Sequence, residues 1–150
     1  MLNIIIPVYN EANTILNILD KVSKLKINKK IIIIDDGSED NSRDLIEDCI
    51  KGKKDFCFFS KNNGGKGSAV KYGLNYADGD YVIIQDGDLE YNPDEILDLL
   101  YFLKKNSLDI VYGSRMMKRN KKYSLAYYMG NYFISLFASL LYSKRVTDME

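Results

Sequence analysis

Histidine is absent from the 150-residue sequence, which removes every mechanism that depends on an imidazole. Ser-His-Asp and Cys-His catalysis are excluded, and so are metal sites built on histidine. Only two cysteines are present, Cys49 and Cys57, and they form no Cys-x-x-Cys pair. That spacing argues against a zinc site or a redox pair, while a single disulfide stays open. Chemistry must therefore come from carboxylates, backbone amides, lysine, arginine or a metal ion held by oxygen.

An excess of either charge is missing as well. The 21 Lys and Arg residues balance 21 Asp and Glu residues, for a formal net charge of zero. Nucleic-acid-binding proteins usually carry a basic excess that neutralises phosphates, so no nucleic-acid partner is expected. The content of 46% hydrophobic and 28% charged residues is typical of a globular protein, and the length suits one domain.

Short apolar runs alternate with helical patterns along the chain. The runs, at residues 3–8, 30–34, 56–59, 81–84 and 108–112, suit strands that are buried on both faces. Apolar residues at helical spacing fall in residues 15–25, 45–50, 69–77 and 96–103. This alternation predicts an α/β fold with a mostly parallel central sheet and helices on both of its faces.

Ligands of open parallel sheets bind beyond the carboxyl ends of the strands. Each expected strand is followed there by small, acidic or phosphate-compatible residues. These clusters are Pro7-Val8-Tyr9-Asn10-Glu11, Asp35-Asp36-Gly37-Ser38, Asn62 to Ser68, Asp86-Gly87-Asp88-Leu89-Glu90 and Gly113-Ser114-Arg115. Since the carboxyl ends of parallel strands share one edge of a sheet, we expect the active site at that edge.

The loop at Asp86-Gly87-Asp88 is the candidate metal-binding site of the sequence. Asp86 and Asp88 can converge on one Mg²⁺ or Mn²⁺ ion, with Glu90 supporting them directly or through water. Gly87 lets the backbone approach a diphosphate closely. A calcium-binding EF-hand is excluded, because Tyr91 stands where its glycine is required. The alternative is an acidic turn that caps the next helix without a cation.

Asp35 and Asp36 follow the second strand and have two interpretations. They form a bare turn in which Ser38 or Asp40 caps the next helix, or the Asp36 carboxylate accepts hydrogen bonds from a nucleobase or ribose beside Ile34.

The glycine-rich segment at residues 64–68 fits neither the dinucleotide fingerprint nor the P-loop. It either admits a phosphate or sugar to a helix N-terminus or only lets a helix pack closely.

Residues 124–142 are mainly apolar and aromatic, and their length approaches a membrane span. Three interpretations stay open, namely a core or interfacial helix, a helix lying on a bilayer, and a span.

Residues 115–122, just before this segment, hold five basic side chains and no acid, which suits a solvated loop or a clamp for phosphate or an anionic membrane surface. The N-terminus shows no features of a signal peptide, which predicts a cytoplasmic location.

Taken in order, the five clusters resemble the inverting family-two glycosyltransferases of the GT-A fold, above all the dolichol- and polyprenyl-phosphate mannosyl- and glucosyltransferases. The resemblance covers essentially the whole chain. It implies a Rossmann-like three-layer sandwich, and it implies that residues 1–150 are a glycosyltransferase catalytic domain cut short on its C-terminal acceptor side.

The resemblance also implies a reaction. A sugar would pass with inversion from a nucleotide sugar of GDP-mannose or UDP-glucose type to an acceptor such as polyprenyl or dolichyl phosphate, at the inner face of a membrane. A lipid phosphate is already anionic and needs little general-base help, whereas a sugar hydroxyl requires a carboxylate base. The residues expected to hold the nucleoside are Pro7, Tyr9, Glu11, Ile34 and Asp36.

By the same resemblance, Asp86, Asp88 and Glu90 match the family's metal-binding run, and Arg115 matches an arginine near the phosphates of donor or acceptor. Asp88 and Asp148 are expected as catalytic residues, Asp148 as the candidate base. Two other functions stay open, namely a nucleotide-sugar-binding but inactive fragment and a sugar-phosphate nucleotidyltransferase. The second would favour a glycine- and arginine-rich loop after the first strand, where this chain has other residues.

Overall fold

The structure is a computed structural model that describes residues 1–113 and 125–142. It divides into two compact units, Met1–Tyr101 and Phe102–Glu150. The boundary falls inside helix α4 (Glu95–Lys105), whose first turns belong to the first unit. All strands of the described residues lie in the first unit.

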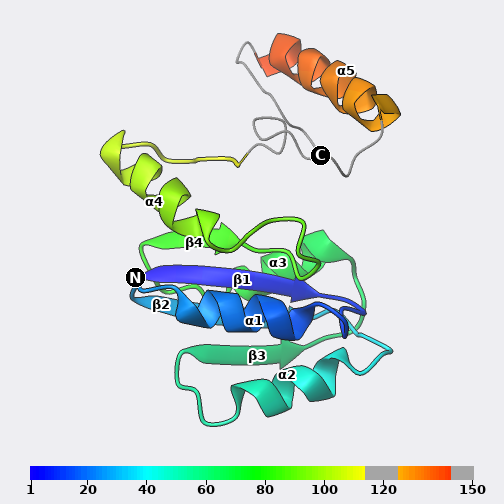
Figure 1. The fold of residues 1–150 in the computed structure, drawn as a ribbon, viewed down its shortest axis with the longest axis vertical. Coiled ribbons are helices and arrows are strands. Elements are labelled where there is room, and N and C mark those ends of the chain that lie inside the picture. The colour runs from blue at the N-terminus through cyan, green and yellow to red at the C-terminus, as the bar shows by residue number, and fades with distance from the viewer. Residues whose placement is uncertain (114–124, 143–150) are drawn as a thin grey trace. The chain divides into compact units, whose positions relative to one another are not determined.

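A four-stranded sheet in which every pairing is parallel forms the centre of the first unit (Figure 1). Its strands are β1 (Leu2–Val8), β2 (Lys29–Asp35), β3 (Phe56–Ser60) and β4 (Tyr81–Ile84), in the spatial order β3-β2-β1-β4. The chain therefore builds outward from β1 to one edge and then returns to the other side of β1. Such a reversal of strand order leaves a crevice at the carboxyl ends of the two strands beside it, here β1 and β4.

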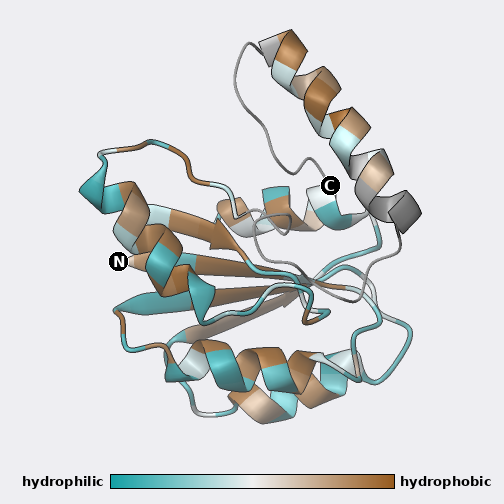
Figure 2. Cartoon of the chain, turned by 45° about the horizontal axis from the view of Figure 1, so that its top comes forward, coloured by the Kyte–Doolittle hydropathy of each residue, from teal (hydrophilic) through white to brown (hydrophobic). Residues whose placement is uncertain are grey.

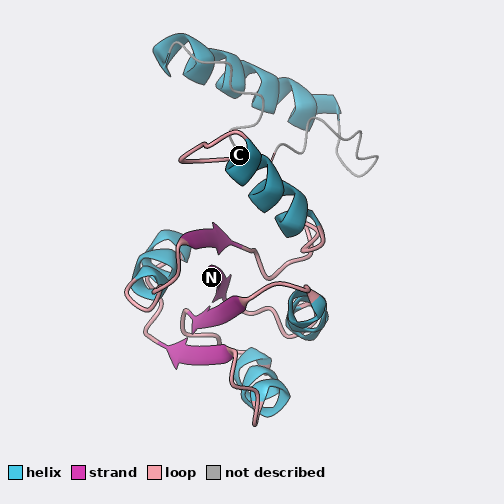
Figure 3. Cartoon of the chain, turned by 90° about the vertical axis from the view of Figure 1, so that its left-hand side faces the viewer, coloured by secondary structure: helices cyan, strands magenta, loops and turns pink. Residues whose placement is uncertain are grey.

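Helices cover both faces of this sheet, as the side view in Figure 3 shows. Successive strand residues point to opposite faces, so Ile4 and Ile6 pack with helices α1 (Ile15–Lys24) and α2 (Ser42–Ile50), and Ile5 packs with helix α3 (Lys66–Leu74). The strands are drawn mainly in the colour of apolar residues in Figure 2. The central strands β1 and β2 are buried from both sides, whereas the edge strands β3 and β4 are only partly covered. The predicted α/β architecture with three layers is confirmed.

Helix α3 lies close to the sheet because of Gly73. A β-carbon at this position would lie 2.8 Å from Cγ2 of Ile5 and 3.2 Å from Cγ1 of Ile34. These are core atoms with little room to move, so a larger residue would push α3 off the sheet. Since α3 begins at the carboxyl edge, this contact also sets where its N-terminus lies.

The strand predicted at residues 108–112 is not formed. Residues 108–113 are irregular, and the sheet of the described residues ends at β4. Leu108, Ile110 and Tyr112 are 39%, 65% and 85% exposed, so no layer of the described residues covers this apolar run. A strand requires a neighbour that pairs with its backbone, and an apolar pattern in the sequence cannot supply one.

The second unit contains helix α5 (Leu125–Tyr142). Several of its large apolar side chains are exposed, including Phe133, Phe137 and Leu140, while Ser135 and Ala138 are buried. In the part of the chain that the structure describes, no helix combines the length and the apolar character needed to cross a membrane.

Candidate active site

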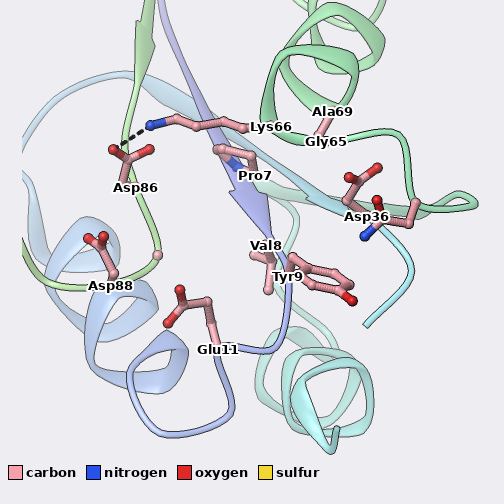
Figure 4. A pocket seen from close by; sticks show the side chains of 12 residues that line it. Pro7, Val8, Tyr9, Glu11, Asp36, Gly65, Lys66, Ala69, Asp86 and Asp88 are labelled. Atoms are coloured by element: carbon pink, nitrogen blue, oxygen red, sulfur yellow. Dashed lines mark hydrogen bonds and ion pairs between the residues drawn. The ribbon is translucent and has the colours of Figure 1, made fainter. Parts of the chain in front are cut away.

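A pocket of about 420 Å³ lies at the carboxyl edge of the sheet (Figure 4). Its volume falls within the range of roughly 300–1,000 Å³ that is typical of small-molecule sites. All four strands contribute through the segments that follow them or end them: Pro7, Val8, Tyr9 and Glu11 at β1, Asp36 at β2, Asn63, Gly65, Lys66 and Ala69 at β3, and Asp86, Gly87 and Asp88 at β4. Four of the five clusters that the sequence placed at one edge therefore meet in one pocket.

One side of the pocket is acidic. Figure 4 shows the carboxylates of Asp86, Asp88 and Glu11 on this side, away from Asp36 and Tyr9. Asp86 Oδ2 lies 2.7 Å from the Lys66 ammonium, and Thr14 Oγ1 donates a hydrogen bond of 2.6 Å to Glu11 Oε2. The concentration of carboxylates is thus only partly neutralised by the protein itself.

The loop after β4 holds Asp88 in a short turn. Asp88 Oδ1 accepts a hydrogen bond of 3.0 Å from the Glu90 amide, and Leu89 between them has a positive φ of 66°. Gly87 packs against Glu11, since a β-carbon there would lie 3.3 Å from Glu11 Cγ. Any larger residue at position 87 would crowd Glu11, so glycine leaves this part of the pocket open.

Within the described ranges, Asp86 and Asp88 could hold a divalent cation only together with ligands from outside the protein. Among the described residues, no three His, Cys, Asp or Glu side chains are grouped closely enough to hold a metal ion. Glu90, expected as the third ligand, is not among the residues that line the pocket, whereas Asp86 and Asp88 are. Mg²⁺ is commonly held by one or two carboxylates together with waters and substrate phosphates, and the two aspartates meet that requirement.

Asp36 forms the opposite side of the pocket and is almost completely buried. It forms an ion pair with Lys61 and accepts hydrogen bonds from the Gly64 amide. Burial raises the pKa of Asp36, but the Lys61 ammonium and the Gly64 and Gly65 amides outweigh it, so the pKa lies below its ordinary value. The carboxylate is charged near neutral pH and already engaged by the protein.

Five hydrogen bonds between backbone amides and side chains tie the segment after β1 to the segment after β2 and the start of α2. The backbone amides of Asn10, Glu11 and Ala12 donate to Ser38 Oγ, Ser42 Oγ and Asp40 Oδ2, over 3.0, 2.8 and 3.0 Å. In return, the amides of Glu39 and Asp40 donate to Asn10 Oδ1 over 2.8 and 3.3 Å. We call this set the cross-loop clamp.

The capping interpretation is only partly confirmed. Asp40 Oδ1 accepts from the amide of Ser42, the first residue of α2, whereas Ser38 is used by the clamp.

The remaining predicted site residues do not line the pocket or lie outside the described residues. Ile34, expected beside the nucleoside, does not line the pocket, because strand alternation points its side chain under α3, where it is fully buried. Arg115 and Asp148 lie outside the described residues. Lys66 was not assigned a role from the sequence, although it lines the pocket and contacts Asp86. The glycine-rich segment around it was the available signal.

The layered α/β architecture, with acidic residues after β4 in a pocket at the switch in strand order, is that of a GT-A glycosyltransferase. The model of the family "Glycosyl transferase family 2" matches residues 3–146, so the chain belongs to this family. The resemblance found in the motifs is therefore confirmed.

The chain is similar to two curated proteins in particular. It is 34% identical to an uncharacterized protein of Methanocaldococcus jannaschii over 150 residues, covering 94% of this chain and 63% of that protein. It is 35% identical to the undecaprenyl-phosphate 4-deoxy-4-formamido-L-arabinose transferase of Proteus mirabilis over 123 residues, covering 78% of this chain and 37% of that protein. The chain thus spans less than two thirds of either relative.

Among solved structures, a mannosyltransferase of Pyrobaculum calidifontis in complex with GDP-Man and Mn²⁺ has a TM-score of 0.62 and 24% identity to this chain. The match covers 68% of this chain and 32% of that one. At this level of identity the likeness concerns the fold, and it agrees with the three-layer arrangement found here.

Proposed function

We propose that the pocket binds the nucleoside diphosphate part of a nucleotide sugar and that the protein transfers the sugar, with inversion, to a lipid phosphate of polyprenyl or dolichyl type. One observation carries the proposal. Residues that follow or end all four strands line a single pocket with an acidic side next to Lys66 and a second side at Tyr9 and Asp36. These two sides match the two parts of a nucleoside diphosphate, the phosphates and the nucleoside.

The nucleoside would lie between Tyr9 and Asp36. Tyr9 is 45% exposed and lines the pocket, so its ring is available to pack against a flat base or a ribose. Asp36 is ionised and can accept hydrogen bonds from nucleoside N–H or O–H groups. Pro7 completes this wall. Glu11 would reach the nucleoside from the acidic side of the pocket, where the cross-loop clamp holds its backbone in place.

The diphosphate would lie on the side of Asp86 and Asp88. These carboxylates would hold Mg²⁺ or Mn²⁺, which supplies positive charge next to the departing diphosphate when it is bound. Gly87 leaves room for the phosphates to approach the backbone, and Asp88 is kept in place by the Glu90 amide. The proposed catalytic contribution of Asp86 and Asp88 is thus to favour the charge that develops on the leaving group.

A lipid phosphate as acceptor explains how the reaction proceeds without histidine. Its oxygen is anionic near neutral pH and attacks the anomeric carbon directly, which inverts the configuration in one displacement. Support comes from the name of the P. mirabilis relative, which acts on an undecaprenyl phosphate, and from the exposed apolar side chains of α5, which suit a bilayer surface. In this proposal the reaction takes place at the cytoplasmic face of a membrane. Arg115 would bind the phosphates of donor or acceptor. Asp148 would serve as base if the acceptor were a sugar hydroxyl instead.

Calorimetric titration tests the donor site. UDP, GDP, UDP-glucose and GDP-mannose are titrated into the purified chain with Mn²⁺ and with EDTA. We expect one nucleotide to bind only with Mn²⁺ and its binding to be lost in Asp88→Ala. Asp48→Ala, which removes an exposed acid from α2, is the matched control and should bind like the wild type.

No binding of any of the four nucleotides to a folded chain would overturn the proposal. The acceptor is tested by incubating the chain and the preferred donor with vesicles that contain undecaprenyl phosphate. Sugar should enter the lipid fraction only when the lipid phosphate is present. Nucleotide binding without such transfer would contradict the catalytic part of the proposal and favour a donor-binding module.

A further inference from the structure

Asp86, one of the two carboxylates proposed to hold a divalent cation, is already paired with a lysine of the protein. Lys66 Nζ lies 2.7 Å from Asp86 Oδ2, although the two residues come from different loops of the sheet edge. Asp86 is largely buried, with its side chain 18% exposed, whereas the Lys66 side chain is 64% exposed. In Figure 4 the lysine reaches across the pocket opening from the start of α3 to the segment after β4.

This contact has a simple electrostatic reason. Asp86, Asp88 and Glu11 bring three carboxylates to the same side of the pocket, where their mutual repulsion is unfavourable without a nearby positive charge. The Lys66 ammonium supplies that charge to one of them. An exposed lysine is attached by four flexible methylene groups, so it can also leave the carboxylate with little rearrangement of the backbone.

A divalent cation on Asp86 and the Lys66 ammonium would repel each other at such a distance, so the binding of one to that carboxylate weakens the binding of the other. The backbone of Lys66 is anchored as the first residue of α3, and Gly65 and Ala69 beside it also line the pocket. When Lys66 leaves Asp86, its ammonium therefore stays within reach of the pocket. Once the cation occupies the acidic side, the phosphate oxygens of a bound donor are strong acceptors for this ammonium.

On the basis of the proposed function, we infer that Lys66 is an exchangeable counter-ion of the active site. It neutralises Asp86 in the cation-free pocket, leaves Asp86 when the cation binds, and then contacts the diphosphate of the donor. Cation and nucleotide binding are coupled through this exchange, because the cation releases the lysine that the nucleotide uses. Lys66 thereby counts as a donor-binding residue whose availability depends on the cation.

The variant Lys66→Met tests the exchange by binding measurements alone. Mn²⁺ affinity, followed by electron paramagnetic resonance without nucleotide, should rise about two- to fivefold, because the competing ammonium is gone. Affinity for the nucleoside diphosphate with Mn²⁺ present should fall about tenfold, because a charged contact is lost. Lys71→Met removes the same charge from an exposed position of α3 and should change neither value.

A second comparison keeps the test specific to Asp86. In an Asp86→Asn background the lysine has lost its charged partner, so adding Lys66→Met should no longer raise Mn²⁺ affinity. Circular dichroism confirms that each variant is folded. A rise of the same size with and without Asp86 would show only a general charge effect and would overturn the exchange.

The outcomes separate this inference from the proposed function. If the wild type binds nucleotide with Mn²⁺ and Lys66→Met leaves the Mn²⁺ affinity unchanged, the exchange is wrong and the donor site stands. If Lys66→Met raises Mn²⁺ affinity and leaves nucleotide affinity unchanged, the move to the diphosphate is wrong. If the wild type binds no nucleotide under any condition, both proposals fail.

Discussion

Asp36 binds the backbone of Gly64 with both of its carboxylate oxygens, over 3.2 Å from Oδ1 and 3.1 Å from Oδ2. Asp36 follows β2 and Gly64 lies just before α3, so this contact fixes the loop from which Gly65 and Lys66 enter the pocket. Lys61 completes the arrangement by an ion pair to the same carboxylate. The side of the pocket proposed for the nucleoside is therefore held together before any ligand binds.

Replacing Asp36 should change how stability depends on pH. The pKa of Asp36 is lowered in the folded protein, so its contribution to the free energy of unfolding is present above roughly pH 4 and lost as the pH falls through the folded pKa. Asp36→Asn should cost about 1–3 kcal/mol at pH 7, since Lys61 loses its charged partner. The difference from the wild type, measured by urea unfolding, should shrink between pH 5 and pH 3. A difference that stays constant over this range would contradict the assignment.

The cross-loop clamp should stabilise the fold through Asp40. Its two carboxylate oxygens accept from the amides of Ala12, in the segment after β1, and Ser42, at the start of α2. Asp40→Ala should lower the free energy of unfolding by about 1 kcal/mol, the usual effect of losing a cap-like bond. Glu39→Ala is the control, because only the backbone of Glu39 takes part in the clamp. Equal losses in both variants, measured by chemical denaturation, would show that the Asp40 bonds do not matter.

Two glycines of α3 should respond in opposite ways to the same substitution. Gly73→Ala places a methyl group 2.8 Å from Ile5 Cγ2 and should destabilise the protein by about 1–3 kcal/mol. Gly67→Ala meets no atom within 4 Å and should be neutral or stabilise it by up to about 1 kcal/mol, as alanine favours a helix. Thermal unfolding of the two variants measures the difference. Similar melting temperatures would mean that α3 can move away from the sheet at little cost.

Gly87 should matter for binding more than for stability. A β-carbon there lies 3.3 Å from Glu11 Cγ, a tight contact with a side chain that lines the pocket. Gly87→Ala should change the free energy of unfolding by less than about 1 kcal/mol, because Glu11 is part of an open surface and can shift. Nucleotide affinity with Mn²⁺, measured by calorimetry, should fall markedly. Unchanged affinity would show that the space beside Gly87 is not used by the ligand.

The main elements could be predicted because their signals are local. β4 was expected at Tyr81–Ile84 and is found there, and the apolar spacing that begins at Ile15 marks α1. Each pattern depends only on neighbours within a few residues, namely alternation in a strand and a period of 3.6 in a helix. Where the signal was local but the partner was distant, prediction failed. Residues 108–112 have a strand-like composition, yet nothing in the described sheet pairs with them.

The sequence by itself determined the class of fold, the order of the motifs and the edge of the sheet at which they gather, because parallel strands bring every following loop to the same side. The tertiary structure alone decided which side chains share the pocket. It directed Ile34 into the core beneath α3 and placed Lys66 on Asp86, 20 positions away in the sequence. Such contacts depend on how α3 and the loop after β4 pack across the sheet, and no pattern within either segment encodes that distance.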